Sequence, residues 1–322
     1  MRHVKPEPVK HGRSDSAPKR RAKSSSAKTA SVVPEEYTDI NALSSPASAQ
    51  KKKGKAVVIT ILSIFIVGFL VGFTMLLITL IRAWNEQKTF DDLSDMVLDT
   101  DEVNDDGSLR KYDDLYNKNP DFFGWLKIEG TKIDYPVMYK PEDSEYYLHR
   151  DFYGKYSDSG MLFIDGECPR VSNYYLIYGH HMNNGTMFGE LPNYGKKAFY
   201  EKHKIIFFDT RYENRDYEVV AAFYGKIYPE EEEKNHFCYY KYKNLTSEKT
   251  FNEYVKNVKA NQIYETGITP KFGDELITLS TCNYHTENGR FVVVARRIKD
   301  TDKNKTKTSS SSSSKASSSK SK

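Results

Sequence analysis

Apolar residues gather in one long, uninterrupted run near the N-terminus of the chain. Residues 56–81 hold 26 successive positions without a charged side chain. At about 1.5 Å per residue, a helix over this run is about 39 Å long, which is enough to cross a hydrocarbon core of about 30 Å with some tilt. The pattern therefore predicts one transmembrane helix over residues 56–81.

After this run the apolar positions take up the spacings of folded helices and strands. Residues 82–116 carry apolar side chains at helical spacing and predict one or two helices, with a break at residues 105–108. Eight short apolar runs separated by turn residues then predict strands. They cover residues 123–128, 133–138, 160–164, 173–178, 204–208, 217–227, 275–280 and 291–298. Short strands at such spacing predict a mainly β domain, either a closed barrel or a sandwich.

Two further segments between the predicted strands show helical character. Residues 192–200 predict a short helix. Residues 247–261 predict a longer one, because apolar side chains three and four positions apart share one face of a helix. These side chains are Phe251, Tyr254, Val255 and Val258.

The two ends of the chain are too polar to form a core. Residues 1–55 contain 13 Lys and Arg against 5 Asp and Glu, and residues 301–322 are mostly Ser, Lys and Thr. Neither segment can bury enough apolar surface to offset the entropy lost on ordering, so both are predicted to be disordered. These tails carry much of the net charge of +4. Because a membrane segment follows the basic tail, its charge favours anionic lipid headgroups over nucleic acid.

The charges that flank the apolar run predict its orientation. Lys51, Lys52, Lys53 and Lys55 precede the run, whereas only Arg82 follows it closely and acidic residues come next. The excess of positive charge lies on the cytoplasmic side of a membrane helix, so the N-terminus is expected in the cytoplasm and the later residues outside. A cleaved signal peptide is disfavoured, because the run is too long and residues 81–84 offer no small-residue cleavage site.

Three cysteines are present, at positions 168, 238 and 282. An extracellular domain can form disulfides, but an odd number leaves at least one thiol unpaired within the chain. A bond between Cys168 and Cys238 stays open at this point, and the spacings fit no zinc pattern.

Three short segments place reactive side chains at the ends of predicted strands. ELITLSTC ends at Cys282, NYYLIYGHHM contains His180 and His181, and NGR brings Arg290 to the start of the last strand. A thiol becomes a nucleophile on ionisation, and an imidazole can take its proton and later protonate a leaving amine. A permanently charged guanidinium can stabilise the oxyanion of an acyl intermediate. Together the three residue types suffice for acyl transfer.

The same segments resemble the motifs of the sortase family. TLSTC (278–282) matches the family pattern TLxTC, YGHHM (178–182) is similar to the strand-end histidine motif, and Arg290 follows the cysteine by eight residues. The resemblance covers residues 117–298. It is strongest to class B sortases in the stretches GWLKI, IDYPV and YYLHRDFYGKYSDSGMLFID.

The resemblance implies a role for each site residue. Cys282 is expected to be the nucleophile, His180 the general acid and base, and Arg290 the clamp for the oxyanion or substrate. Three more residues flank the motifs and are expected to line the peptide groove, although packing in the barrel explains Tyr178 and Thr281 equally well. They are Tyr178, Ser280 and Thr281. The weaker candidates for the histidine and arginine roles are His181, His285, Arg296 and Arg297.

The resemblance also implies the architecture. The expected catalytic domain, residues 117–300, is a closed eight-stranded sortase-type barrel with N-terminal helices and an inserted helix before the cysteine strand. The enzyme would be held in the membrane of a Gram-positive cell by residues 56–81, with the catalytic domain outside.

The implied reaction needs no metal or organic cofactor. The enzyme would cleave an NPxTN-like or PPxTG-like C-terminal sorting signal after Thr, form a thioester on Cys282, and pass the protein to an amine of a peptidoglycan stem peptide or cross-bridge. Two alternatives stay open. One is a thiol peptidase that uses water as acceptor, and the other is a catalytically silent cell-wall scaffold domain.

Overall fold

The structure is a computed structural model that describes residues 47–283 and 286–299. His285, residues 1–46 and residues 300–322 lie outside the described residues, so the predictions made for them stay predictions.

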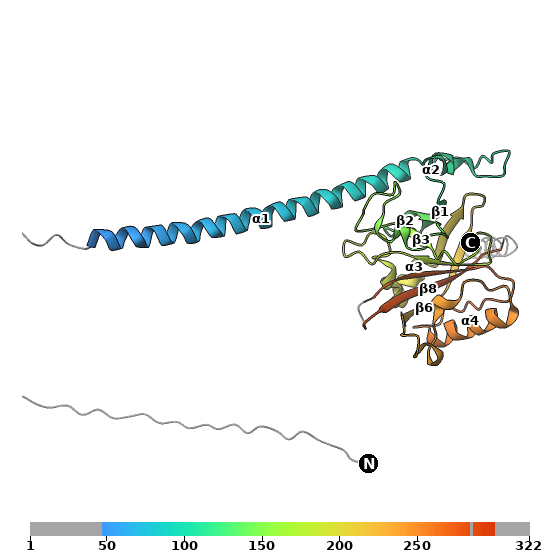
Figure 1. The fold of residues 1–322 in the computed structure, drawn as a ribbon. Coiled ribbons are helices and arrows are strands. Elements are labelled where there is room, and N and C mark those ends of the chain that lie inside the picture. The colour runs from blue at the N-terminus through green and yellow to red at the C-terminus, as the bar shows by residue number, and fades with distance from the viewer. Residues whose placement is uncertain (1–46, 284–285, 300–322) are drawn as a thin grey trace, which may run out of the picture. The chain divides into compact units, whose positions relative to one another are not determined.

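The first described element is the helix α1 (Ala47–Asp95), which runs unbroken through the predicted membrane segment (Figure 1). It starts nine residues before position 56 and passes Arg82 without a break. Residues 47–55, which were expected to be disordered, belong to this helix. After Arg82 no Gly or Pro interrupts the helix before Asp95.

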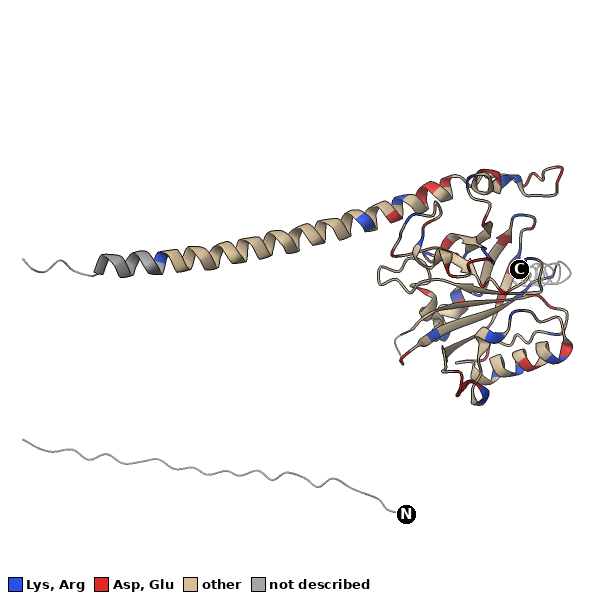
Figure 2. Ribbon diagram, viewed as in Figure 1, with Lys and Arg blue, Asp and Glu red and all other residues tan. Residues whose placement is uncertain are grey.

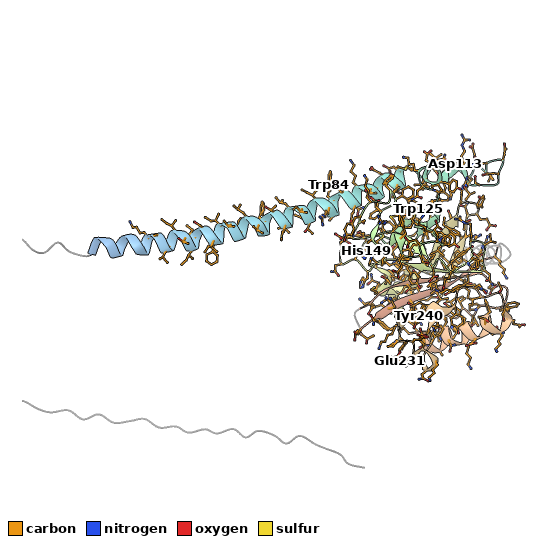
Figure 3. The ribbon with its side chains drawn as sticks, viewed as in Figure 1. Trp84, Asp113, Trp125, His149, Glu231 and Tyr240 are labelled. Atoms are coloured by element: carbon orange, nitrogen blue, oxygen red, sulfur yellow. The ribbon has the colours of Figure 1, made fainter. Side chains whose placement is uncertain are left out.

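Charged side chains avoid the central part of α1. Figure 2 shows the coloured part of the helix as tan over most of its length, with a blue band at its start and blue and red bands towards the barrel. Within the described residues, it is the one helix long and apolar enough to cross a membrane, and its most apolar stretch is not buried. Trp84 projects from it close to the end of the apolar run (Figure 3).

The last turns of α1 pack on the strands that follow. Phe90 and Leu93 are buried. The rings of Phe90 and Tyr135 pack edge to face, with their centres 5.1 Å apart. The chain then forms an irregular segment with a turn at Gly107, a 3-10 turn (Arg110–Tyr112) and α2 (Asp113–Lys118). The predicted helices before the barrel are therefore present, but the break between them begins near Met96 rather than at residue 105.

The eight predicted strands are all present and close into one barrel. Along the barrel wall their order is β1-β2-β3-β4-β7-β8-β6-β5, and β5 pairs with β1. Two neighbouring pairs, β2–β3 and β4–β7, are parallel, and the others are antiparallel. The strands are β1 (Phe122–Lys127), β2 (Asp134–Met138), β3 (Leu162–Ile164), β4 (Tyr174–Tyr178), β5 (Ile205–Thr210), β6 (Asp216–Lys226), β7 (Leu276–Cys282) and β8 (Gly289–Arg297). Closure leaves no free sheet edge, and the expected closed barrel is confirmed.

Short helices fill the connections between strands. The helix predicted over residues 192–200 is divided into a 3-10 turn (Leu191–Gly195) and α3 (Lys197–Lys202), because Lys196 between them has extended backbone angles. The longer helix is confirmed as α4 (Glu248–Asn261), with the hydroxyl of Ser247 accepting a hydrogen bond from the Thr250 N–H at its start. It lies between β6 and β7 in the chain and precedes the cysteine strand.

One face of α4 is buried against the barrel. The four apolar side chains predicted to share this face are all buried. The Tyr254 hydroxyl lies 2.5 Å from Thr278 Oγ1 on β7, so the helix is joined to the strand that carries Cys282 by a buried hydrogen bond as well as by apolar contact.

We expect Phe251→Ala to lower the free energy of unfolding by about 3–5 kcal/mol, because it removes a fully buried ring from beneath α4. Phe272→Ala removes the half-exposed ring whose centre lies 5.9 Å from that of Phe251, and it should cost less because only part of that ring is buried. Urea unfolding followed by near-ultraviolet circular dichroism measures both. A loss for Phe251→Ala well below the expected range would show that α4 does not depend on its buried face.

Candidate active site

Cys282 is the last residue of β7, two positions beyond the predicted end of the strand. The preceding residues of the strand are buried, whereas Cys282 is half-buried. Its position combines a rigid strand with access from outside, which is what a reacting thiol requires.

Arg290 lies directly across from Cys282 on the neighbouring strand. The antiparallel register of β7 and β8 pairs the two residues. Side chains of directly opposed residues lie on the same face, with Cβ atoms about 4.5–5.5 Å apart. The turn before β8 brings Arg290 there, and Asn288 in that turn has a positive φ of 56°, which Asn tolerates better than most residues.

His180 follows the end of β4, the strand on the other side of β7. The parallel register pairs Tyr178 with Ser280. His180 and Cys282 each follow this pair by two residues, and both line the same pocket. Gly179 connects Tyr178 to His180. A side chain is disfavoured at this position, because its Cβ would lie 2.4 Å from Leu162 Cδ2 and 2.7 Å from a ring carbon of Phe188.

The three side chains line one pocket of about 360 Å³ at these strand ends. The pocket walls come from β3, β4, β7, β8 and two connecting segments, one containing Leu148 and the other Tyr240 and Lys243. Figure 3 labels His149 and Tyr240 in these two segments. Sequence positions more than 100 residues apart therefore meet in a single concave site.

His180 is held by the segment before β3. Its Nε2 lies 2.8 Å from the backbone oxygen of Leu148, and its ring centre is 5.2 Å from that of His149. A carbonyl oxygen only accepts, so Nε2 carries the proton in this arrangement and Nδ1 stays available. Burial lowers the pKa of His180 below its ordinary 6.5, and the charge of His149 lowers this pKa further. The hydrogen bond to the Leu148 carbonyl opposes both effects, because it favours the charged ring.

The three residues expected to line the groove do border the pocket, but in different ways. The Tyr178 hydroxyl donates to Asp165 Oδ2 at 3.1 Å. Ser280 is buried, with its hydroxyl 2.7 Å from that of Tyr239. Thr281 is buried too, and its Oγ1 has no hydrogen-bond partner among the described residues.

The three weaker candidates that the structure describes do not line this pocket. His181 is not among the residues lining the pocket, and its Nδ1 lies 3.0 Å from the backbone oxygen of Cys282. Arg296 and Arg297 are at the far end of β8, where they pair with Glu218 and Glu275. The geometry therefore favours His180 and Arg290 as neighbours of the thiol.

Sequence reasoning missed an ion pair in the wall of the pocket. Lys243 Nζ lies 2.5 Å from Asp165 Oδ2, and both residues line the pocket. Asp165 is the last residue of the stretch YYLHRDFYGKYSDSGMLFID, so the family resemblance could have indicated it as a site residue. Lys243 precedes α4 in a segment where no motif marks it.

The other two cysteines do not take part in the site. Cys168 and Cys238 are buried and free, so the disulfide left open by the sequence is not formed. Burial raises the pKa of the Cys168 thiol to about 12, which keeps it protonated and unreactive. In the described part of the chain, no cluster of three His, Cys, Asp or Glu side chains is arranged to hold a metal ion.

Comparison with known proteins agrees with this geometry. A family model for the sortase domain matches residues 126–298. Sortase B of Staphylococcus aureus is 31% identical over 193 residues, covering 59% of this chain and 75% of that protein. Sortase B of Listeria monocytogenes is 29% identical over 255 residues, covering 76% of this chain and 96% of that protein. A solved Staphylococcus aureus sortase B–substrate complex has a TM-score of 0.60 at 26% identity, covering 68% of this chain and 99% of that one.

The chain therefore belongs to the sortase family, whose members are cysteine transpeptidases. The relatives it matches are class B enzymes, so the resemblance drawn from the sequence motifs is confirmed.

We expect His180 to titrate below 6.5 and to be neutral at pH 7, because burial disfavours its charged form. Since the folded pKa lies below the unfolded one, this histidine supports folding above pH 6.5 and loses that contribution as the pH falls through its folded pKa. Nuclear magnetic resonance of the histidine ring protons measures the pKa, with His180→Gln for assignment. His149→Gln should raise it, because a neighbouring charge is removed. A His180 pKa above 6.5 would contradict the buried environment.

Proposed function

We propose that Cys282, His180 and Arg290 transfer secreted proteins from a C-terminal sorting signal to an amine of peptidoglycan. The observation that carries the proposal is the register of β4, β7 and β8, which gathers a half-buried thiol, an imidazole and a guanidinium around one pocket. Family membership supplies the reaction class, and the Staphylococcus aureus enzyme has been solved as a substrate complex.

In the first half-reaction, the neutral ring of His180 takes the proton of the Cys282 thiol, and the resulting thiolate attacks the carbonyl carbon of Thr in an NPxTN-like or PPxTG-like signal. The carbon–nitrogen bond breaks, a thioester forms, and His180 gives a proton to the departing amine. Arg290 donates hydrogen bonds to the carbonyl oxygen as it becomes negative. Each role follows from the chemistry of a side chain that faces the pocket.

In the second half-reaction, an amine from a stem peptide or cross-bridge attacks the thioester. His180 takes up its proton, the new amide forms and the thiol is released. A thioester also reacts with water, and the acceptor present in the pocket decides between transfer and hydrolysis.

Helix α1 would hold the enzyme at the membrane. The large apolar side chains between Lys55 and Arg82 are exposed along it, as expected for a surface that faces lipid. With the lysines before the helix in the cytoplasm, the barrel would lie outside, where secreted proteins and wall precursors meet.

The test of the reaction uses the detergent-solubilised chain with NPxTN-like and PPxTG-like peptides, a small amine acceptor and mass spectrometry. We expect cleavage after Thr and an acyl adduct on Cys282. Cys282→Ala should abolish both, His180→Ala should slow cleavage by about 10²–10⁴-fold, and Arg290→Ala by about 10²–10³-fold.

Two matched variants serve as controls. Arg297→Ala removes another guanidinium from β8, and Cys238→Ala removes another thiol, so both should remain active. Cleavage without amine transfer would favour a peptidase. The absence of any adduct on a folded protein with a titratable Cys282 thiol would point to a silent scaffold.

The orientation is tested in cells stripped of their wall. External protease should digest the barrel while an N-terminal tag stays protected, because the lysines hold that end in the cytoplasm. Replacing Lys51, Lys52, Lys53 and Lys55 by Gln should weaken this preference. Release of the full chain by alkaline washing would refute a membrane-spanning α1.

A further inference from the structure

The turn of α1 that follows the apolar run is hydrogen-bonded to the loop before β3. Glu86, five residues after Ile81, accepts three hydrogen bonds from successive residues of that loop. Ser157 Oγ and the Asp158 N–H reach its Oε1 at 2.9 and 3.0 Å, and Ser159 Oγ reaches its Oε2 at 2.6 Å. All three donors are neutral, so the carboxylate is the only charge of the contact.

Both serines are buried. Ser157 is 3% exposed and Ser159 is 1% exposed. A buried hydroxyl that loses its partner is costly, so the carboxylate fixes this loop strongly.

The loop is in turn bonded to the turn that holds His180. The Ser157 N–H donates to the His149 carbonyl at 3.1 Å, and the Met161 N–H donates to the Tyr147 carbonyl at 3.0 Å. His149 is the last residue of the 3-10 turn Tyr146–His149, whose Leu148 carbonyl contacts the His180 ring. A series of hydrogen bonds, linked through adjacent residues of the chain, therefore runs from Glu86 to the imidazole.

We infer that Glu86 is a positioning residue for the acid–base histidine: by fixing residues 157–159 it sets the Leu148 carbonyl that orients His180. The inference rests on the role proposed above for His180. The segment of α1 next to the apolar run would then contribute to the reaction, because the packing of α1 on the loop and the orientation of the His180 ring are coupled.

A consequence for the protonation of His180 follows from this arrangement. Losing the Leu148 contact removes an interaction that favours the imidazolium, so the pKa of His180 should fall below its value in the unaltered protein. The ring of His149 from the 3-10 turn lies beside that of His180. The other titratable or charged groups that line the same pocket are Glu145, Asp165, Tyr178, Tyr240, Lys243, Cys282 and Arg290. Substitution at Glu86 alters the chemical identity of none of these groups.

The experiment compares Glu86→Ala with Gln87→Ala in the full chain in detergent, because Gln87 is an exposed neighbour on α1 that bonds only Asp91 within the described residues. We expect Glu86→Ala to lower kcat about 10- to 100-fold, since an error of about 1 Å in the placement of a catalytic group costs up to that much. KM should change little, the pKa of His180 should fall, and amides 157–160 should exchange faster. Gln87→Ala should match the unaltered protein.

A milder variant guards against misfolding. Ser159→Ala removes one of the three donors and should shift kcat and the His180 pKa in the same direction, by less. Unchanged kcat and unchanged His180 pKa in folded Glu86→Ala would overturn the inference, as would a loss confined to KM. Failure of the proposed function is distinguishable, because the unaltered protein would then form no adduct, or His180→Ala would be fully active.

Discussion

The register between three neighbouring strands is the constraint on which the site depends. β7 pairs in parallel with β4 and antiparallel with β8, and these pairings set Tyr178 against Ser280 and Cys282 against Arg290. Side chains alternate along a strand. A slip of one residue in the pairing would therefore turn the side chain of Cys282, His180 or Arg290 to the other face of the barrel wall. Closure of the barrel on both sides of these strands resists such a slip.

Burial determines the protonation of the side chains in the pocket at the ends of these strands. The pocket removes water from His180, so the neutral imidazole is favoured. Arg290 adds a positive charge on the strand opposite the thiol. The Tyr178 hydroxyl is kept from ionising, because burial and the adjacent Asp165 carboxylate both raise its pKa. The pocket therefore combines a neutral imidazole with a guanidinium and a hydroxyl that keep their protons.

Segments outside the barrel wall supply the rest of the site. The Leu148 turn holds the ring of His180, and the segment before α4 contributes Lys243 to the pocket. The hydrogen bond of Tyr254 to Thr278 joins α4 to β7. The helices and loops thus support the strands whose ends carry the reactive groups, and Glu86 extends this support to the segment adjoining the membrane span.

The amino-acid sequence by itself determined the elements and pointed to the residues of the candidate site. Strand and helix periodicity is local, so eight strands, the buried face of α4 and the apolar run were readable, as was the position of Cys282, His180 and Arg290 beside strand ends. Helix boundaries were not, because α1 continues past Arg82 without a break and Lys196 adopts extended backbone angles within a predicted helix. Only the tertiary structure decided which partners these residues meet. Glu86 contacts Ser157 across 71 positions and Lys243 contacts Asp165 across 78, and such contacts depend on how distant segments pack rather than on any local pattern.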